Sequence, residues 1–466
     1  MSERPVHYQS LMEVSSRIRR GESASVEVTR AMLDRIAALD GGLHAYSVVM
    51  ADVAMAAAEA ADRETAAGTS RGPLHGVPVA VKDLCRTKGV RTRAGMPLLN
   101  DYVPDYDSTA VARFREAGAV LLGKLELTEG AFACHHPDVV APVNPWNSDF
   151  WPGASSSGSG VATVTGLCYG SLGSDTGGSI RFPSLACAVT GLKPTWGRVS
   201  RHGVFMLSDT LDHLGPMART AEDCAALLGA IAGRDDHDHH TSLEPVPDYL
   251  AELEKGIGGL RIGWDEDHCT HDVDPEVASG LQAALRDLER AGAKVVEVTI
   301  PDTREVIAHW AVICAAETAV AHEDTYPAQG SSYGRELKAH IDFGRAATSL
   351  DVGRANACRN HWRGTLARLF ERIDMFIAPP YPDLTPTVDG FMTVMDSPDG
   401  LHRLTRYTAP HDMSGSPTLS LPCGFSSAGR PLGFQLVGRD FGEDILLRAG
   451  HAYQQETDWH HRHPDR

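Results

Sequence analysis

The sequence of 466 residues lacks any long apolar run, and this absence limits what kind of protein it encodes. No uninterrupted stretch of about 18 apolar residues occurs, so the sequence predicts no membrane-spanning helix. The N-terminal segment MSERPVHYQS is polar and has no apolar core of the kind that a signal peptide needs. We therefore expect a cytoplasmic protein.

Paired cysteine motifs are also missing. The nine cysteines are scattered, odd in number and contain no CxxC pair. This distribution argues against a zinc site and against a secreted disulfide framework. It favours reduced, buried thiols, as in a cytoplasmic protein.

Positive charge is in deficit. Lys and Arg number 43 against 61 Asp and Glu, which gives a formal net charge of −18 with neutral histidines. An acidic surface repels phosphate backbones, so we expect no direct binding of nucleic acid. A small neutral substrate remains compatible with this charge.

The distribution of apolar residues predicts an α/β protein. Hydrophobic residues make up 42% of the chain, enough for a large core. Strand-like and helix-like segments alternate, which predicts a large mixed, mostly parallel central β-sheet sandwiched by helices. We expect one domain over residues 1–466, with a helical N-terminal region (1–70), a catalytic core (71–233) and a C-terminal α/β portion (259–466).

Hydrophobic periodicity places the main elements. We expect helices at 51–67, 109–118, 220–232, 275–291, within 304–322 and 351–373, and at 441–456. We expect strands at 76–81, 119–122, 259–263, 294–299 and 375–378, and a pair of strands at 418–421 and 433–437. The Gly- and Ser-rich stretch 153–203 is expected to be core structure joined by tight turns, because such a long loop is rare in a compact domain.

Three short segments carry groups suited to catalysis. The first is Pro78–Asp83, an apolar strand that ends in Lys82. A lysine at the end of a strand is usually at the surface. If it is buried instead, desolvation lowers its pKa and makes a neutral amine available as a base, as in Ser–Lys variants of the serine triad.

The second segment, Pro152–Gly160, is rich in Ser and Gly and lies between aromatic residues and an apolar run. A flexible loop is one interpretation. The other is a strained turn in an active site, since glycine permits unusual dihedral angles and close approach of the backbone.

The third segment is Gly173–Pro183, in which Gly177 and Gly178 precede Ser179. Successive backbone N–H groups here can point to one position and form an oxyanion hole beside a nucleophile. A tight turn capped by Ser179 is the simpler alternative. Neither glycine-rich segment matches G-x-S-x-G, which disfavours an α/β-hydrolase.

Taken in this order, the three segments resemble the amidase-signature family of serine hydrolases. The likeness extends over essentially the whole chain, through Asn144–Asn147, Gly191–Pro194, Leu214–Met217 and Gly433–Gly438. Ser155 and Ser179 are separated by 179 − 155 = 24 residues, a spacing similar to that of the two catalytic serines of the family.

The resemblance implies a role for each residue. Ser179 would be the nucleophile, Ser155 would follow a cis peptide bond and pass the proton, and Lys82 would be the base. The backbone N–H groups of Thr176, Gly177, Gly178 and Ser179 would hold the oxyanion, with Ser156, Asp175 and Arg181 in support. No metal or organic cofactor has a role in this scheme.

One departure from the family concerns the serine turn. The turn usually has the sequence Gly-Gly-Ser-Ser-Gly-Gly-Ser, whereas this chain has Ala154 at the second position and Ser157 at the fifth. Ala154 adds a Cβ where the backbone is tight. Neither change removes a group that transfers a proton, so we expect activity to survive.

The expected substrate is a small-molecule amide, or a related carbamate or ester, bound by a monomer or homodimer. Cys134, His135 and His136 are candidate pocket residues, because the family places variable substrate contacts near them; packing is the equally weighted alternative. We expect segments 130–140, 310–335 and 381–415 to shape the pocket.

Two other functions are compatible with the sequence. The chain also resembles the A subunit of a glutamyl-tRNA amidotransferase, which releases ammonia from glutamine for a partner subunit. The variant turn at Ala154 and Ser157 favours a stand-alone enzyme. A catalytically inactive binding protein on the same scaffold is disfavoured, because Lys82, Ser155 and Ser179 are all present.

Overall fold

The computed structural model describes residues 4–397 and 399–465. Residues 1–3, 398 and 466, which belong to the predicted regions 1–70 and 259–466, lie outside the described residues. The strands are β1 (Tyr46–Val49), β2 (Pro78–Lys82), β3 (Val120–Leu125), β4 (Gly170–Asp175), β5 (Thr190–Lys193), β6 (His213–Ala218), β7 (Arg261–Trp264), β8 (Lys294–Glu297), β9 (Met375–Ala378), β10 (Thr418–Phe425) and β11 (Pro431–Gly438). They form one sheet in the order β1-β3-β2-β4-β6-β5-β10-β11-β9-β7-β8.

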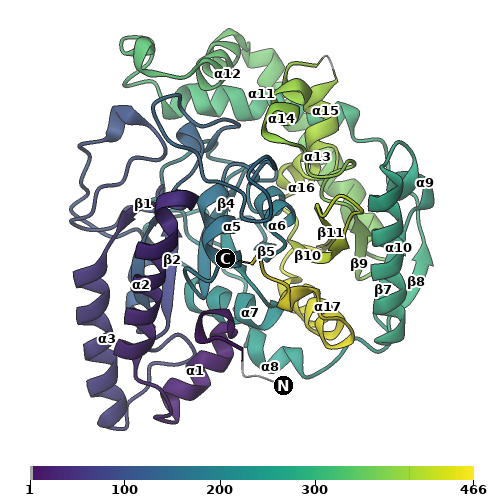
Figure 1. Cartoon of the computed structure of the whole chain (residues 1–466). Helices are drawn as coiled ribbons and strands as arrows, with labels where there is room; N and C mark the ends of the chain where they lie inside the picture. Colours follow the sequence, from purple (N-terminus) through teal and green to yellow (C-terminus); the bar gives the residue numbers. More distant parts are fainter. Residues whose placement is uncertain (1–3, 398, 466) are drawn as a thin grey trace.

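The helices surround this sheet (Figure 1). They are α1 (Leu11–Arg19), α2 (Ser25–Leu43), α3 (Ala51–Ala66), α4 (Thr109–Glu116), α5 (Ser157–Val164), α6 (Arg181–Cys187), α7 (Ala221–Ile231), α8 (Tyr249–Leu253), α9 (Glu266–Thr270), α10 (Pro275–Arg290), α11 (Arg304–Ala321), α12 (Arg335–Ala346), α13 (Ser349–Leu369), α14 (Val388–Met395), α15 (Gly400–Thr405), α16 (Ala409–Ser414) and α17 (Glu443–Glu456). Within the described residues, no helix combines the length and the apolar character that crossing a bilayer requires.

The predicted large mixed sheet flanked by helices is confirmed, and its parallel pairing is confined to two blocks. β3, β2 and β4 pair in parallel, as do β8, β7 and β9. The strands between these blocks pair antiparallel, including the predicted pair β10 and β11. Strands from the predicted catalytic core and from the C-terminal portion thus join in a single sheet.

Strand β4 is the element that brings the serine segments together, and its small residues make this possible. A Cβ at Gly173 would lie 2.9 Å from Ser156 Oγ, on the face covered by α5. A Cβ at Gly170 would lie 2.5 Å from the Leu227 side chain of α7, on the opposite face. Helices therefore approach both faces closely, and the predicted core structure between 153 and 203 is confirmed.

A buried ion pair holds the end of strand β2. Lys124 of β3 and Asp83 are both fully buried, and Lys124 Nζ lies 2.9 Å from Asp83 Oδ1. Lys124 Nζ also donates to Thr92 Oγ1 at 2.7 Å, and Ser47 donates to the second Asp83 oxygen. The pair fixes the residue next to Lys82.

We predict that Lys124→Met lowers the free energy of unfolding by about 3–5 kcal/mol, because it leaves the buried Asp83 carboxylate without its counter-ion. Equilibrium unfolding in urea measures the change. Lys338→Met, at an exposed position on α12, is the matched control and should change stability by less than about 0.5 kcal/mol. A loss below about 1 kcal/mol at position 124 would contradict the importance of this pair.

Candidate active site

Lys82 lies at the end of β2 with its ammonium group enclosed by hydroxyls. The residue is fully buried, and Nζ lies 2.7 Å from Ser155 Oγ, 2.9 Å from Ser156 Oγ and 2.9 Å from Ser174 Oγ. Burial lowers the pKa of Lys82 to about 7, although nearby acidic side chains act in the opposite direction. A large fraction of the amine is therefore neutral near pH 7 and able to accept a proton.

The serine turn leads directly into helix α5. The peptide bond between Ala154 and Ser155 is cis, as the resemblance implies. Ser156 Oγ accepts from the Ser174 N–H at 3.3 Å and donates to the Ser174 carbonyl at 3.2 Å. Ser156 thus ties the turn to β4 while it contacts Lys82, which is the supporting position expected for it.

The structure accommodates both departures from the usual turn. The Ala154 side chain packs in an apolar cluster with Trp151 and Phe182. The Ser157 hydroxyl lies 3.0 Å from His135 Nε2. Each additional group therefore has a partner, and neither displaces Ser155 from Lys82.

Asp175 organises the loop that carries Ser179. Its carboxylate accepts from the backbone N–H groups of Gly178 (2.6 Å) and Ile180 (2.8 Å). It also forms a buried ion pair with Arg181 at 2.7 Å, and Arg181 contacts Asp412 at 2.6 Å. Burial alone would raise the pKa of Asp175, but the Arg181 guanidinium and these hydrogen bonds hold that pKa well below its usual range. Asp175 and Arg181 thus occupy the bracing positions expected for them.

The backbone donors of this loop differ in one respect from the expectation. The N–H groups of Thr176, Gly177 and Ser179 make no hydrogen bond to any described residue. The Gly178 N–H is different, because it already donates to Asp175 Oδ1. Thr176, Gly177 and Ser179 are therefore the members of the expected set whose N–H groups are free, whereas the Gly178 N–H is occupied.

The Ser179 side chain is partly exposed in the wall of a cavity. Within the described part of the chain, its hydroxyl has no hydrogen-bond partner, so the contact with Ser155 is not formed in this geometry. Catalytic hydrogen bonds are often long without substrate and tighten when it binds. The structure thus brings Lys82 and Ser155 into contact and places Ser179 on the adjoining loop.

The cavity beside Ser179 is lined almost wholly by apolar groups. Its lining residues are Ala131, Phe132, Ala133, Trp151, Ala154, Thr176, Gly177, Ser179, Phe182, Leu207, Trp310, Cys314, Phe391, Met395, Leu401, Leu404 and Thr405. Segments 130–140, 310–335 and 381–415, which were expected to shape the pocket, all contribute residues to this lining. No charged side chain is among these residues.

Cys134, His135 and His136 do not line this cavity, which corrects their expected role. Cys134 packs against Met392, His135 pairs with Ser157, and His136 Nδ1 accepts from the backbone of Asp138. The lining comes from the preceding residues 131–133 instead.

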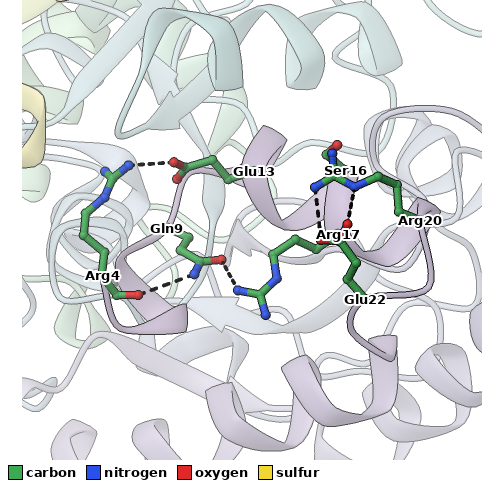
Figure 2. Close-up of a pocket in the computed structure, with 7 residues that line it drawn as sticks. All are labelled: Arg4, Gln9, Glu13, Ser16, Arg17, Arg20 and Glu22. Carbon is green, nitrogen blue, oxygen red and sulfur yellow. Dashed lines mark hydrogen bonds and ion pairs between the residues drawn. The ribbon is translucent and has the colours of Figure 1, made fainter. Parts of the chain in front are cut away.

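Another hollow, beside α1, is a poor candidate for catalysis. It is lined by Arg4, Gln9, Glu13, Ser16, Arg17, Arg20 and Glu22 (Figure 2). Arg4 pairs with Glu13 and Arg20 with Glu22, so its charges are largely paired with one another. None of the residues implied by the resemblance belongs to it.

A possible metal-binding group also lies apart from Ser179. Glu305 and His309 of α11 and Cys358 of α13 bring three ligand atoms within 4.8 Å of one another. Glu305 is exposed, and none of the three lines the Ser179 cavity. None of the three contacts the hydroxyl groups around Lys82.

Three further contributors were not named individually from the sequence, although Trp310 and Asp412 fall within the segments 310–335 and 381–415 that were expected to shape the pocket. Ser174 is the third hydroxyl on Lys82, Asp412 is the second carboxyl on Arg181, and Trp310 donates from Nε1 to the Thr176 carbonyl at 2.8 Å. Ser174 could have been inferred from its position one residue before Asp175 at a strand end. No local pattern marks Asp412 or Trp310, because each meets the site only through the tertiary fold.

Comparison with known proteins agrees with this arrangement. Residues 27–447 match the amidase family. The chain is 44% identical over 455 residues to the Mycobacterium tuberculosis (strain ATCC 25618 / H37Rv) protein named "Putative amidase AmiD", covering 97% of this chain and 95% of that protein. It is 39% identical over 485 residues to the A subunit of the glutamyl-tRNA(Gln) amidotransferase of Roseiflexus sp. (strain RS-1), with 99% of each covered.

A solved structure shares the whole fold. The native peptide amidase from Stenotrophomonas maltophilia superposes with a TM-score of 0.84 at 31% sequence identity, and the match covers 99% of both chains. The family match extends over most of the chain, and the sequence relatives align almost from end to end. The chain therefore belongs to the amidase family.

Proposed function

We propose that this protein hydrolyses the amide bond of a small neutral molecule, with Ser179 as nucleophile, Ser155 as proton relay and Lys82 as base. The observation that carries the proposal is the buried Lys82 amine, 2.7 Å from Ser155 Oγ and with its pKa lowered by burial. Ser179 lies on the adjoining loop and faces a cavity that can hold an acyl group.

The chemistry follows from these positions. Ser179 Oγ attacks the substrate carbonyl carbon while its proton passes to Ser155 and the Ser155 proton passes to Lys82 Nζ. The C–N bond then breaks as the relay returns a proton to the departing amine. Water hydrolyses the resulting ester by the same path, releasing the carboxylic acid and restoring Ser179.

The free backbone N–H groups of Thr176, Gly177 and Ser179 provide the electrostatic part of catalysis. They would donate to the oxygen that becomes negative when the tetrahedral intermediate forms, and fixed donors in a desolvated site are effective for this purpose. Gly178 acts indirectly, since its N–H holds the loop to Asp175.

The lining of the cavity favours an apolar acyl group over glutamine. Glutamine carries an ammonium and a carboxylate, and charged groups are costly to bury without partners. Because no lining residue is charged, we favour a stand-alone amidase over one component of an amidotransferase. Carbamates and short esters present an equivalent carbonyl and remain within the proposed class.

The remaining expectations accompany this proposal. The enzyme would act in the cytoplasm as a monomer or homodimer, without direct contact to nucleic acid and without a cofactor. Purified single chain should therefore be active by itself.

Ser179→Ala and Ser155→Ala are each expected to lower kcat by at least about 10⁴-fold, because members of a catalytic relay act as a unit. The rate of amine release from an apolar anilide measures the loss. Ser420→Ala is the matched control, since Ser420 is a buried serine of β10 whose hydroxyl lacks a partner among the described residues. A fluorophosphonate should label the wild type at Ser179; full turnover by Ser179→Ala would refute the proposal.

The dependence of kcat/KM on pH should follow Lys82. Because the neutral amine is the active base, kcat/KM is expected to rise with pH up to about 7, the pKa of Lys82, and then level off. Burial also raises the pKa of Asp212 to about 6, close to the pKa of Lys82. An experiment must therefore identify which of the two groups causes the rise of kcat/KM. Added methanol raises the pKa of a carboxyl but not that of an ammonium group. A limb that moves upward in methanol would contradict the assignment to Lys82.

A substrate panel should separate the two candidate functions. We expect anilides and amides of apolar acids to be hydrolysed at least about 100-fold faster, in kcat/KM, than glutamine, since binding glutamine would bury two unpaired charges. Aryl carbamates and esters belong in the same panel. Preference for glutamine, or activity that requires an added partner protein, would favour the amidotransferase alternative instead.

A further inference from the structure

The loop from Asp175 to Ser179 contains four successive peptide units, and the carbonyl of each lies within hydrogen-bond distance of a group outside the loop. A trans peptide unit is planar, and its C=O and N–H point in opposite directions. A hydrogen bond to the carbonyl therefore fixes the direction of the N–H in the same unit.

Three of these units have a free N–H, and in each the carbonyl is held. The Asp175 carbonyl lies 3.2 Å from His213 Nδ1, the Thr176 carbonyl accepts from Trp310 Nε1 at 2.8 Å, and the Gly178 carbonyl accepts from the Phe182 N–H at 2.7 Å. The N–H groups opposite these carbonyls belong to Thr176, Gly177 and Ser179.

The remaining unit, between Gly177 and Gly178, differs from the others because both its carbonyl and its N–H are held. The Gly177 carbonyl accepts from Thr408 Oγ1 at 2.6 Å, while the Gly178 N–H donates to Asp175 at 2.6 Å. Removing the Thr408 hydroxyl would still leave this unit fixed by Asp175. It serves to anchor the loop, and its N–H is not available to a substrate.

Trp310 is the side chain on which the direction of the Gly177 N–H depends. It belongs to α11, far along the chain from the loop, and it is 6% exposed. Its ring packs directly on the backbone, because a Cβ at Gly177 would lie 2.5 Å from Trp310 Cζ2. The indole thus restrains this unit both by contact and by hydrogen bonding.

We propose that Trp310 is a positioning residue for catalysis, which aims the Gly177 N–H at the oxyanion by holding the Thr176 carbonyl. The proposal rests on the proposed function, in which Ser179 attacks an amide carbonyl. It assigns to Trp310 a role beyond lining the cavity, and it predicts an effect on the transition state that exceeds any effect on substrate binding.

The test replaces the indole and compares kcat with KM. Trp310→Phe keeps an aromatic ring but removes the N–H, and it should lower kcat about 10- to 100-fold, somewhat less than the loss of an oxyanion donor itself. Because Trp310 also lines the cavity, the smaller ring changes a substrate contact as well, so the comparison of kcat with KM needs a variant that keeps the ring volume.

Thr408→Val is the matched comparison. It also removes one side-chain donor to a carbonyl of the same loop, but from the unit that Asp175 holds as well. We expect kcat to fall less than about fivefold in this variant, since the N–H of that unit makes no contact with the oxyanion. Equal losses in Trp310→Phe and Thr408→Val would overturn the specific role of Trp310.

Two further measurements keep the test decisive. Replacing Trp310 by its benzothienyl analogue, in which sulfur takes the place of N–H, keeps the ring volume and guards against loss of folding. A boronic acid that mimics the tetrahedral intermediate should bind this variant more weakly by the same factor as the loss in kcat. A rise in KM with unchanged kcat, or unchanged affinity for the boronic acid, would overturn the proposal.

The results also distinguish this proposal from the function on which it rests. Failure of Ser179→Ala to abolish hydrolysis would refute the catalytic assignment itself. An inactive Ser179→Ala together with a fully active benzothienyl variant would refute only the role of Trp310.

Discussion

The burial of Lys82 is the constraint on which the site depends. An ammonium group removed from water is costly unless an anion pairs with it, and its neighbours within hydrogen-bond distance are three hydroxyls and no carboxylate. The neutral amine is therefore favoured, and the pKa falls to about 7. A carboxylate in direct contact would stabilise the charged form and remove the base. The acidic groups that do act on Lys82, Asp175 and Asp212, lie beyond that distance and only moderate the shift.

The same separation explains how Asp175 is used. Its charge is needed beside the loop, where it collects two or more backbone N–H groups, yet it must not pair with Lys82. Arg181 resolves this conflict by taking the carboxylate in a buried ion pair. Arg181 Nη2 also donates to Asp412, so the loop is fixed to an element more than 200 residues further along the chain. Loop geometry and base strength are thus set by one connected group of charges.

The sequence predicted those parts of the site whose residues are close together in the chain. The strand with Lys82, the serine turn and the Ser179 loop each carry a local pattern. Hydrophobic periodicity also located elements elsewhere in the chain, for example the strand 375–378 and the helix at 275–290. β1 (Tyr46–Val49) was missed because the whole region 1–70 was predicted to be helical, although Asp40-Gly41-Gly42 is a turn signal shortly before it. Helices α14 and α15 were also missed, since both are short and supply apolar side chains to a cavity.

Tertiary packing determines the contacts of the Ser179 loop that local sequence patterns do not predict. Trp310 and Asp412 are ordinary residues of helices until the fold brings them to the Ser179 loop. Gly178 was counted among the oxyanion donors because its backbone is adjacent to the nucleophile, but the structure gives its N–H to Asp175. Residues close together in the sequence identified the loop. The direction of each N–H, however, depends on which group outside the loop donates to the carbonyl of the same peptide unit. That direction is a property of the whole fold.

The variant serine turn shows how substrate preference and catalytic machinery meet in one segment. Ala154 precedes Ser155, and its methyl group packs with Trp151 and Phe182 in the wall of the cavity. The residue next to Ser155 therefore also lines the cavity beside Ser179. A second glycine here would leave that part of the wall without a side chain, whereas a larger residue would enter the space beside Ser179. Because the methyl group extends the apolar wall up to Ser155, the departure from the usual family sequence agrees with the proposed preference for an apolar acyl group.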